Sequence, residues 1–258
     1  MEPVQSEKKT EEKFDFKNLH FGWFVGHALT VVNAFVFFAS QLLFRPCNFF
    51  YRVSYLGVIA SYGIVLYNSY KPLGSNESYF KRMLLDENAQ YLIVAVYFLL
   101  TRRIAITLLP FFIYSVFHVL EYTEKTLIPA LAPHQTKVQT SIRDVTSKYH
   151  DKAMELTSKI EVVGVMTRLV LGLFVFRSSI LSVLIYAQFL RMRFYMSTDT
   201  RDFLTDAGSQ LDRLLTAPTA HPKIPPAVIN AYATVKEKLG VKPISANTAT
   251  TDATKKQL

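Results

Sequence analysis

Two long apolar stretches of the chain, Ala89 to Leu120 and Val162 to Leu190, carry arginine at their midpoints. Arg102 and Arg103 interrupt the first stretch, and Arg177 interrupts the second. A continuous helix over either stretch would be about 45 Å long, against a hydrocarbon core of roughly 30 Å, and would hold guanidinium groups near the centre of a bilayer. Each stretch is therefore predicted to fold back as a helical hairpin, with its arginines at the tip.

The arms of such hairpins would be short, about 18 to 26 Å at helical rise, so they must tilt, thin the bilayer or end part-way through it. Pro110 lies in the second arm of the first hairpin and is predicted to kink it, because proline removes a donor and clashes with the preceding turn. Arg168 is the one charge clearly inside an arm. It is expected to snorkel to the surface, with pairing to Glu161 or to a lipid headgroup as alternatives. Short paired wedges fit membrane bending better than transport.

The composition is that of an integral membrane protein. Half of the 258 residues are hydrophobic, 14% are aromatic, and the mean hydropathy is +0.18. Phe21 to Phe44 and Val53 to Tyr70 contain no Asp, Glu, Lys or Arg, and each is long enough to cross a bilayer as one helix. The predicted fold class is an all-α integral membrane protein with two N-terminal spans, two short helical hairpins and cytosolic amphipathic helices.

Lysine and arginine, which give the chain a formal net charge of +9, set the predicted orientation. They are richest in the N-terminal tail, the loop from Glu121 to Glu161 and the C-terminal region, and the positive-inside rule places all three in the cytosol. Two spans and two hairpins give the even number of crossings that this requires. The predicted layout is a cytosolic tail (residues 1–20), two transmembrane helices (21–70), a cytosolic loop with a short helix (71–88), a hairpin (89–120), a cytosolic amphipathic helix (121–161), a hairpin (162–190), cytosolic amphipathic helices (191–242) and a disordered tail (243–258).

The cytosolic helices are predicted from apolar stripes. Between His134 and Ile160 the apolar residues recur at spacings of three, four or seven, and interior packing and lipid contact explain this stripe equally well. Two more helices are predicted over Asp199 to Thr216 and Pro226 to Leu239. The first of these places an apolar face toward the membrane or a partner, formed by Phe203, Leu204, Leu211, Leu214 and Leu215.

The last residues contain a candidate sorting signal. Lys255 and Lys256 stand fourth and third from the end. This is the spacing of the dilysine signal by which retrieval coats recognise membrane proteins of the endoplasmic reticulum, and that signal works only in the cytosol. It is an address read by a receptor, not an anchor.

No pattern in the sequence suggests catalysis. Cys47 is the only cysteine, which excludes an internal disulfide and a cysteine-based metal site. His118 and Glu121 are three residues apart and could hold a metal, but an interfacial histidine beside a glutamate just outside the membrane explains them better. Nucleophile motifs, phosphate-binding glycine loops and nucleic-acid-binding motifs are absent from the sequence. We therefore expect neither an enzyme nor a nucleic-acid-binding protein, and no cofactor.

Several segments resemble a known family. The sequence from Leu84 to Leu92, the Leu109-Pro110-Phe111-Phe112 motif and the segment from Tyr186 to Tyr195 are similar to the transmembrane protein 33 family, whose fungal members include a pore membrane protein. The resemblance covers most of the chain from about Tyr51 to Leu215. It implies a multispanning protein of the endoplasmic reticulum and nuclear envelope that associates with reticulon-type tubule shapers, nucleoporins or import receptors and supports the assembly and distribution of nuclear pore complexes.

Two functions follow from these patterns. The first is a structural membrane protein whose hairpins and surface helices contact membrane lipids and stabilise curved membrane at tubules and the pore rim. The alternative is a membrane-anchored adaptor whose cytosolic helices recruit pore, import or stress-response partners. A transporter or channel would need polar groups along full-length spans, and the predicted arms are too short and too apolar for that.

Overall fold

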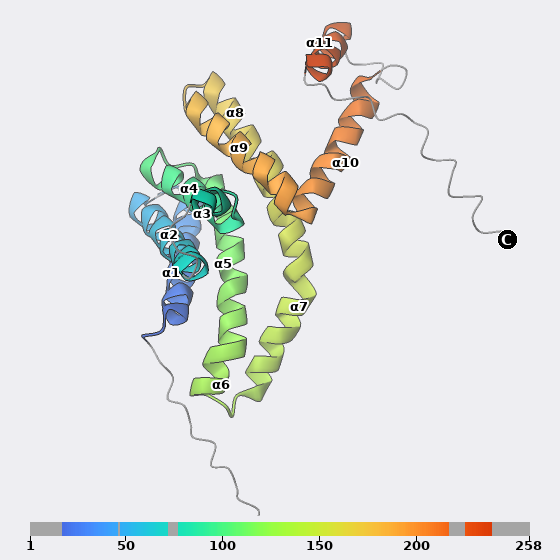
Figure 1. The fold of residues 1–258 in the computed structure, drawn as a ribbon. Coiled ribbons are helices and arrows are strands. Elements are labelled where there is room, and N and C mark those ends of the chain that lie inside the picture. The colour runs from blue at the N-terminus through green and yellow to red at the C-terminus, as the bar shows by residue number, and fades with distance from the viewer. Residues whose placement is uncertain (1–16, 46, 72–76, 217–224, 239–258) are drawn as a thin grey trace, which may run out of the picture. The chain divides into compact units, whose positions relative to one another are not determined.

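The computed structural model describes residues 17–45, 47–71, 77–216 and 225–238, and every regular element within these ranges is a helix (Figure 1). The predicted all-helical fold is confirmed for this part of the chain. The predicted tail at residues 243–258 and most of the N-terminal tail lie outside the described residues. The chain divides into two units, Met1–Thr200 and Arg201–Leu258.

Three helical segments in the described ranges are long enough and apolar enough to cross a membrane. Two of them are α1 (Leu19–Leu42) and α2 (Asn48–Tyr70), with 24 and 23 residues. The third is a composite segment, Ala105–Leu131, of 27 residues. Each exceeds the roughly 20 residues that a helix needs to cross the hydrocarbon core.

Helices α1 and α2 approach each other through small residues. A Cβ atom added to Gly57 would lie 2.5 Å from the carbonyl oxygen of Gly26, and one added to Gly26 would lie 2.8 Å from the carbonyl oxygen of Gly57. The Thr30 hydroxyl donates to the carbonyl of Ser54 at 3.1 Å, across the same contact. The two backbones therefore touch, in the manner of small-residue contacts between membrane helices.

The first apolar stretch breaks beside its arginines. Helix α4 (Glu87–Leu100) follows the short α3 (Glu77–Leu84), and Asp86 caps it by accepting from the Asn88 N–H at 2.8 Å. The chain then turns through residues 101–104, where Arg102 and Arg103 lie, before the 3₁₀ turn η2 (Ala105–Leu108) and α5 (Leu109–Tyr122).

Two details of this stretch correct the prediction. Pro110 lies in the first turn of α5, where its missing N–H removes no helical hydrogen bond, so it starts a helix instead of kinking an arm. The helix also continues past Leu120, through the π turn η3 (Thr123–Leu127) to α6 (Ile128–Leu131), so this arm is not short. Its charged residues are paired: Lys125 with Glu121 at 2.6 Å, and Glu124 with Arg143 at 2.5 Å.

The second apolar stretch continues a longer helix. Helix α7 (Thr136–Lys159) passes through the π turn η4 (Ile160–Val165) into α8 (Met166–Phe174) without a break. The chain turns through residues 175–179, which contain Arg177, and returns as α9 (Ile180–Met196). Figure 1 shows α8 and α9 side by side.

The core of the first unit is rich in aromatic side chains. Tyr51 and Tyr55 of α2 are 1% and 0% exposed, and their hydroxyls lie 3.3 and 2.8 Å from the Thr107 hydroxyl. Phe98 of α4 and Leu169 of α8 are buried in the same cluster. Because these two hydroxyls share a partner, burying Tyr51 and Tyr55 leaves neither hydroxyl without a hydrogen bond.

Helix α10 (Thr198–Leu215) runs into the second unit, which also contains α11 (Pro226–Lys238). Within this unit the Tyr232 hydroxyl donates to Asp212 Oδ1 at 2.6 Å. This hydrogen bond to the carboxylate raises the pKa of Tyr232 to about 12, because the bond favours the protonated phenol.

The contact between α1 and α2 gives a first prediction. Gly57→Ala should lower the free energy of unfolding by about 1–3 kcal/mol, because the new methyl group meets backbone that cannot move aside. Gly63→Ala, in the same helix but with nothing within 4 Å, is the matched control and should be neutral or slightly stabilising. Unfolding of the full-length protein in detergent measures both. Equal behaviour of the two variants would contradict the close approach.

Candidate functional site

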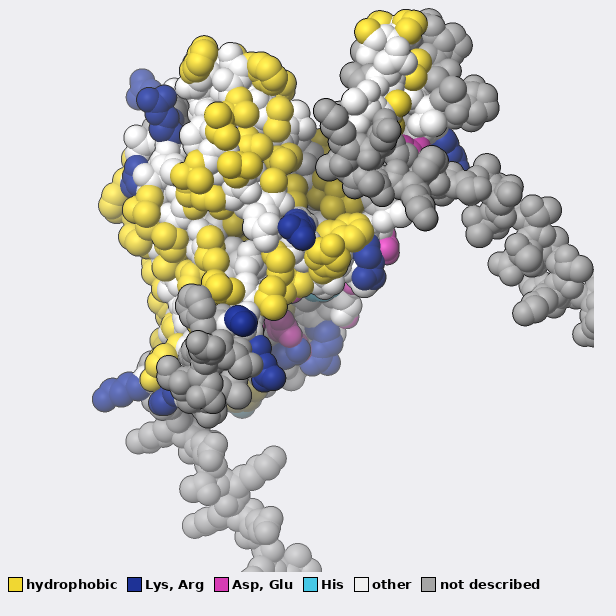
Figure 2. Space-filling model, turned by 45° about the horizontal axis from the view of Figure 1, so that its top comes forward, with side chains coloured by type: hydrophobic (Ala, Val, Ile, Leu, Met, Phe, Trp, Pro, Cys, Tyr) yellow, Lys and Arg dark blue, Asp and Glu magenta, His cyan; other side chains and the backbone are white. Residues whose placement is uncertain are grey.

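An apolar outer surface covers the first unit. Val32 and Phe35 of α1 are 62% and 66% exposed, and Leu171 of α8 and Leu184 of α9 are also more than half exposed. Figure 2 shows hydrophobic side chains over much of one face of the unit. Soluble monomers rarely expose contiguous apolar area on this scale, so this surface is suited to contact lipid.

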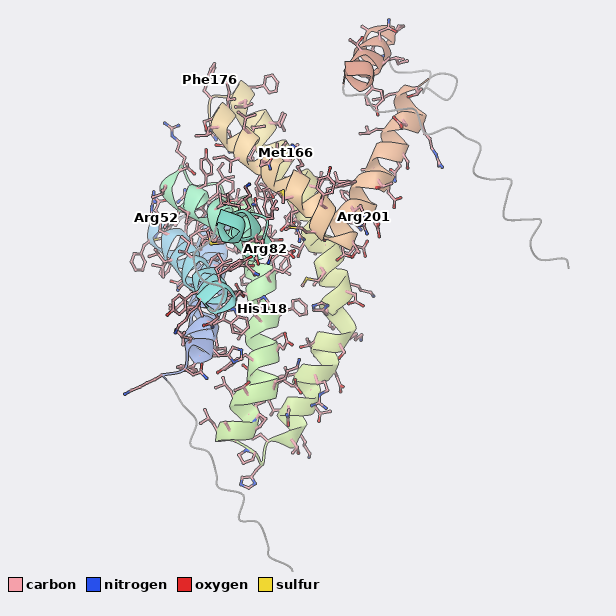
Figure 3. The ribbon with its side chains drawn as sticks, in the orientation of Figure 1. Arg52, Arg82, His118, Met166, Phe176 and Arg201 are labelled. Atoms are coloured by element: carbon pink, nitrogen blue, oxygen red, sulfur yellow. The ribbon has the colours of Figure 1, made fainter. Side chains whose placement is uncertain are left out.

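The α1–α2, α4–α5 and α8–α9 bends lie together at one end of this unit. Arg103, in the α4–α5 bend, donates to Asn48 Oδ1 at the start of α2, at 2.5 Å. Arg52 of α2 donates to the carbonyl of Leu99 at the end of α4. The α4–α5 and α8–α9 bends line one cavity. In Figure 3, Arg52 and Phe176 mark this end of the unit, away from α6. The predicted tip residues Arg102, Arg103 and Arg177 are therefore brought together, while their place in a membrane stays a prediction.

Two of the bends share an unusual helix ending. Phe44 after α1 and Phe176 after α8 have φ of 56° and 54°, the left-handed region that usually requires glycine. The next residue is arginine in both cases, and its N–H bonds back five residues, from Arg45 to Ser40 and from Arg177 to Gly172. Strained backbone of this kind concentrates at functional sites.

A buried charged network lies where α4, α5, η4 and α9 meet. Glu161 and Arg193 are 1% and 4% exposed, and their side chains pair at 3.3 Å (Nε to Oε2). Arg193 also pairs with Glu87 and donates to the Tyr114 hydroxyl at 3.1 Å. The Tyr91 hydroxyl donates to Glu161 Oε1 at 2.8 Å. We call these five residues the Glu161–Arg193 network.

The side chains of this network are linked in a closed ring. The Tyr91 hydroxyl donates to Glu161 Oε1 at 2.8 Å and also lies 3.0 Å from the Tyr114 hydroxyl. Tyr114 in turn accepts from Arg193, which pairs with Glu161. A ring of this kind satisfies both buried charges.

The network resolves one alternative left by the sequence. Glu161 pairs with Arg193 and not with Arg168. The sequence contained a signal for this pair: Glu161 is the last charge before the second apolar stretch, and Arg193 is among the first charges after it. If the stretch folds back on itself, those two positions meet.

His118 belongs to an aromatic cluster. Its ring lies 4.6 Å from that of His27 and 5.1 Å from that of Trp23, and His27 Nδ1 lies 3.0 Å from the Ser115 hydroxyl. Within the described residues there is no group of three or more His, Cys, Asp or Glu placed to hold a metal. The cluster therefore packs α1 against α5.

The predicted apolar face of α10 is only partly covered. Leu211 and Leu214 are 48% and 45% exposed, while Phe203, Leu204 and Leu215 are half-buried. Lys255 and Lys256 lie outside the described residues.

Comparison with known proteins decides the family. The family model described as Transmembrane protein 33/Nucleoporin POM33 matches residues 2–239. The chain belongs to the transmembrane protein 33/POM33 family. It is 31% identical over 246 residues to "Tetra-spanning protein 1" of Schizosaccharomyces pombe, with 88% of this chain and 86% of that protein covered.

Two other fungal relatives carry names that refer to the nuclear pore. "Pore membrane protein of 33 kDa" of Saccharomyces cerevisiae is 30% identical, with 86% of this chain and 83% of that protein covered. "Nucleoporin POM33" of Chaetomium thermophilum is 32% identical, with 80% of each chain covered. No solved structure gives a significant match.

The Glu161–Arg193 network gives a second prediction. Glu161→Ala leaves the buried Arg193 without its most buried partner, and should lower the free energy of unfolding by about 3–5 kcal/mol. Glu155→Ala is the control, because this glutamate is exposed in the same helix and pairs only with exposed Lys159. It should change the stability little. Unfolding of the full-length protein in detergent compares them, and an equally mild effect of both would contradict a structural role for the network.

Proposed function

We propose that this chain is a membrane protein of the nuclear envelope and endoplasmic reticulum that associates with nuclear pore complexes and stabilises curved membrane at the pore rim and along tubules. Membership of the POM33 family and the names of two fungal relatives support the link to the pore. The exposed apolar surface of the first unit supports the membrane setting. The proposal includes no chemical turnover.

One observation supports the curvature part of the proposal: the short helices end at the same side of the unit as the long ones. Helix α4 has 14 residues, about 21 Å at helical rise, and α9 has 17, about 26 Å. Their bends nevertheless lie beside the start of α2, through the contact of Arg103 with Asn48 and the shared cavity. Arms shorter than the roughly 30 Å core thin the lipid around them.

The proposed topology keeps both termini in the cytosol. The bends then face the lumen, and α3, α6 and most of α7 lie at the cytosolic side, where lysine is abundant. Helices on that side add area to the cytosolic leaflet, and a local thinning on the lumenal side adds to the asymmetry. Four crossings, by α1, α2, α4 and α5, agree with the name of the Schizosaccharomyces pombe relative. The α8–α9 pair would then be the added wedge.

Reconstitution tests the curvature proposal. Full-length protein in liposomes of mixed size should concentrate on small vesicles or draw tubules from large ones. The preference should grow in long-chain phosphatidylcholine, because short arms are then more mismatched, and weaken in short-chain phosphatidylcholine. Fluorescence sorting of labelled protein between vesicle sizes measures this. A distribution that ignores both vesicle size and chain length would overturn the proposal.

The alternative is an adaptor, and the exposed leucines of α10 favour it. Leu211 and Leu214 present apolar area in a unit separate from the membrane helices. Such a face could bind reticulon-type proteins, nucleoporins or import receptors. The carboxylates of Asp199, Asp202 and Asp206 weaken any attraction of this helix to anionic lipid.

Deletion of the second unit separates the two functions. Without residues 201–258, the membrane-shaping activity should persist in liposomes, because the first unit retains the bends and the Glu161–Arg193 network. Recruitment of pore or import partners in cells should be lost if α10 and α11 are the adaptor. Loss of curvature sorting on this deletion would instead assign that activity to the second unit.

A further inference from the structure

A cavity of about 440 Å³ lies between the α4–α5 bend and the α8–α9 bend. Its volume falls in the range of small-molecule sites. The polar side chains that line it come from both bends: Thr101, Arg102, Arg177, Ser178, Ser179 and Ser182. Residues about 75 positions apart in sequence thus converge on one space.

Two of the lining residues, Thr101 and Ser178, have hydroxyls that lack a partner among the described residues. Thr101 Oγ1 and Ser178 Oγ are buried atoms without a hydrogen bond to any described residue. Their neighbours are satisfied, since Ser182 Oγ lies 2.7 Å from the Tyr97 hydroxyl and 3.0 Å from Ser179 Oγ. A buried hydroxyl that makes no bond is unfavourable, so either side chain would gain a hydrogen bond by turning toward an acceptor in the cavity.

The charge around the cavity selects an anion. Among the described residues, no hydrogen bond or ion pair engages the guanidinium of Arg102 or Arg177. No Asp or Glu occurs in the segments that contain the three bends, residues 16–76, 88–120 and 162–198. The N-cap of α9, Ser179, also lines the cavity, so the positive end of this helix's dipole lies nearby. Two arginines, with Thr101 and Ser178 next to them in the sequence, match the oxygens of a phosphate group.

The rim of the cavity selects a lipid as the source of that phosphate. Leu100 and Phe176, which line the cavity next to Arg102 and Arg177, are 74% and 90% exposed. Apolar side chains in water would be unfavourable on this scale, whereas acyl chains would cover them. A soluble phosphate would leave this rim bare.

We propose that the joined α4–α5 and α8–α9 bends form a binding site for the phosphate of an anionic phospholipid, held by Arg102 and Arg177 and by the hydroxyls of Thr101 and Ser178. The site goes beyond the proposed curvature function and does not depend on it. Its lipid would join the two bends across the cavity. The left-handed Phe176 places its ring outward at the rim, next to the acyl chains.

The test uses full-length protein in maltoside micelles, which contain no phosphate, and native mass spectrometry with dioctanoyl phosphatidic acid as the probe. The native protein should bind one lipid. Arg102→Gln/Arg177→Gln should weaken binding by about tenfold or more, because it removes two charged donors. Thr101→Val/Ser178→Ala keeps the charge and should weaken binding by about three- to tenfold. Arg82→Gln on α3, an exposed arginine away from the cavity, is the matched control and should bind within about twofold of native.

Two further probes identify the ligand class. Dioctanoylglycerol, which lacks the phosphate, should not bind, and glycerol 3-phosphate, which lacks the chains, should bind far more weakly than the lipid. Equal binding of phosphatidic acid and dioctanoylglycerol would overturn the phosphate site, and equal binding of glycerol 3-phosphate and the lipid would overturn the lipid source. Native-like affinity in the double arginine variant, with helical content and elution volume unchanged, would also overturn the proposal. If that variant does not fold, the hydroxyl pair decides the outcome.

Discussion

The packing of the first unit depends on one buried ion pair, between Glu161 and Arg193. A carboxylate and a guanidinium can remain away from water only if they are paired and hydrogen-bonded. Tyr91 of α4, Tyr114 of α5 and Glu87 supply the additional bonds, so four helical segments are fixed in register at this point. The network therefore fixes where each arm begins. The α4–α5 and α8–α9 bends lie at the other ends of these arms, about the length of one short helix away.

The two ends of the unit are chemically opposite. The end with the network, η3 and α7 contains carboxylates paired with lysine and arginine. The end with the bends contains arginines and hydroxyls, and residues 88–120 and 162–198 contain no acidic residue. Anions are therefore attracted mainly to the end with the bends, where phosphate oxygens can accept hydrogen bonds from arginine.

The POM33 family membership and the fold support one another. A pore rim is a sharply bent sheet of membrane, and this chain combines long helices, such as α1, with arms as short as the 14 residues of α4. Close contact through Gly26 and Gly57 makes the long pair rigid, and the aromatic core around Tyr55 joins the short arms to it. In the proposed function these contacts hold the long and short helices in register, and the surrounding lipid adapts to the shorter arms.

The sequence by itself determined the helical class, the two N-terminal helices of membrane-spanning length and the chain positions at which the apolar stretches break, because apolar runs and charges inside them are local properties of the chain. It did not determine the end of the second arm, which continues to Leu131, with Glu121 and Glu124 paired to Lys125 and Arg143. It also misjudged Pro110, whose effect depends on where the helix starts. The Glu161–Arg193 network and the cavity between the bends were decided only by tertiary structure, since each joins residues far apart in the chain and exists only when the arms pack in one register.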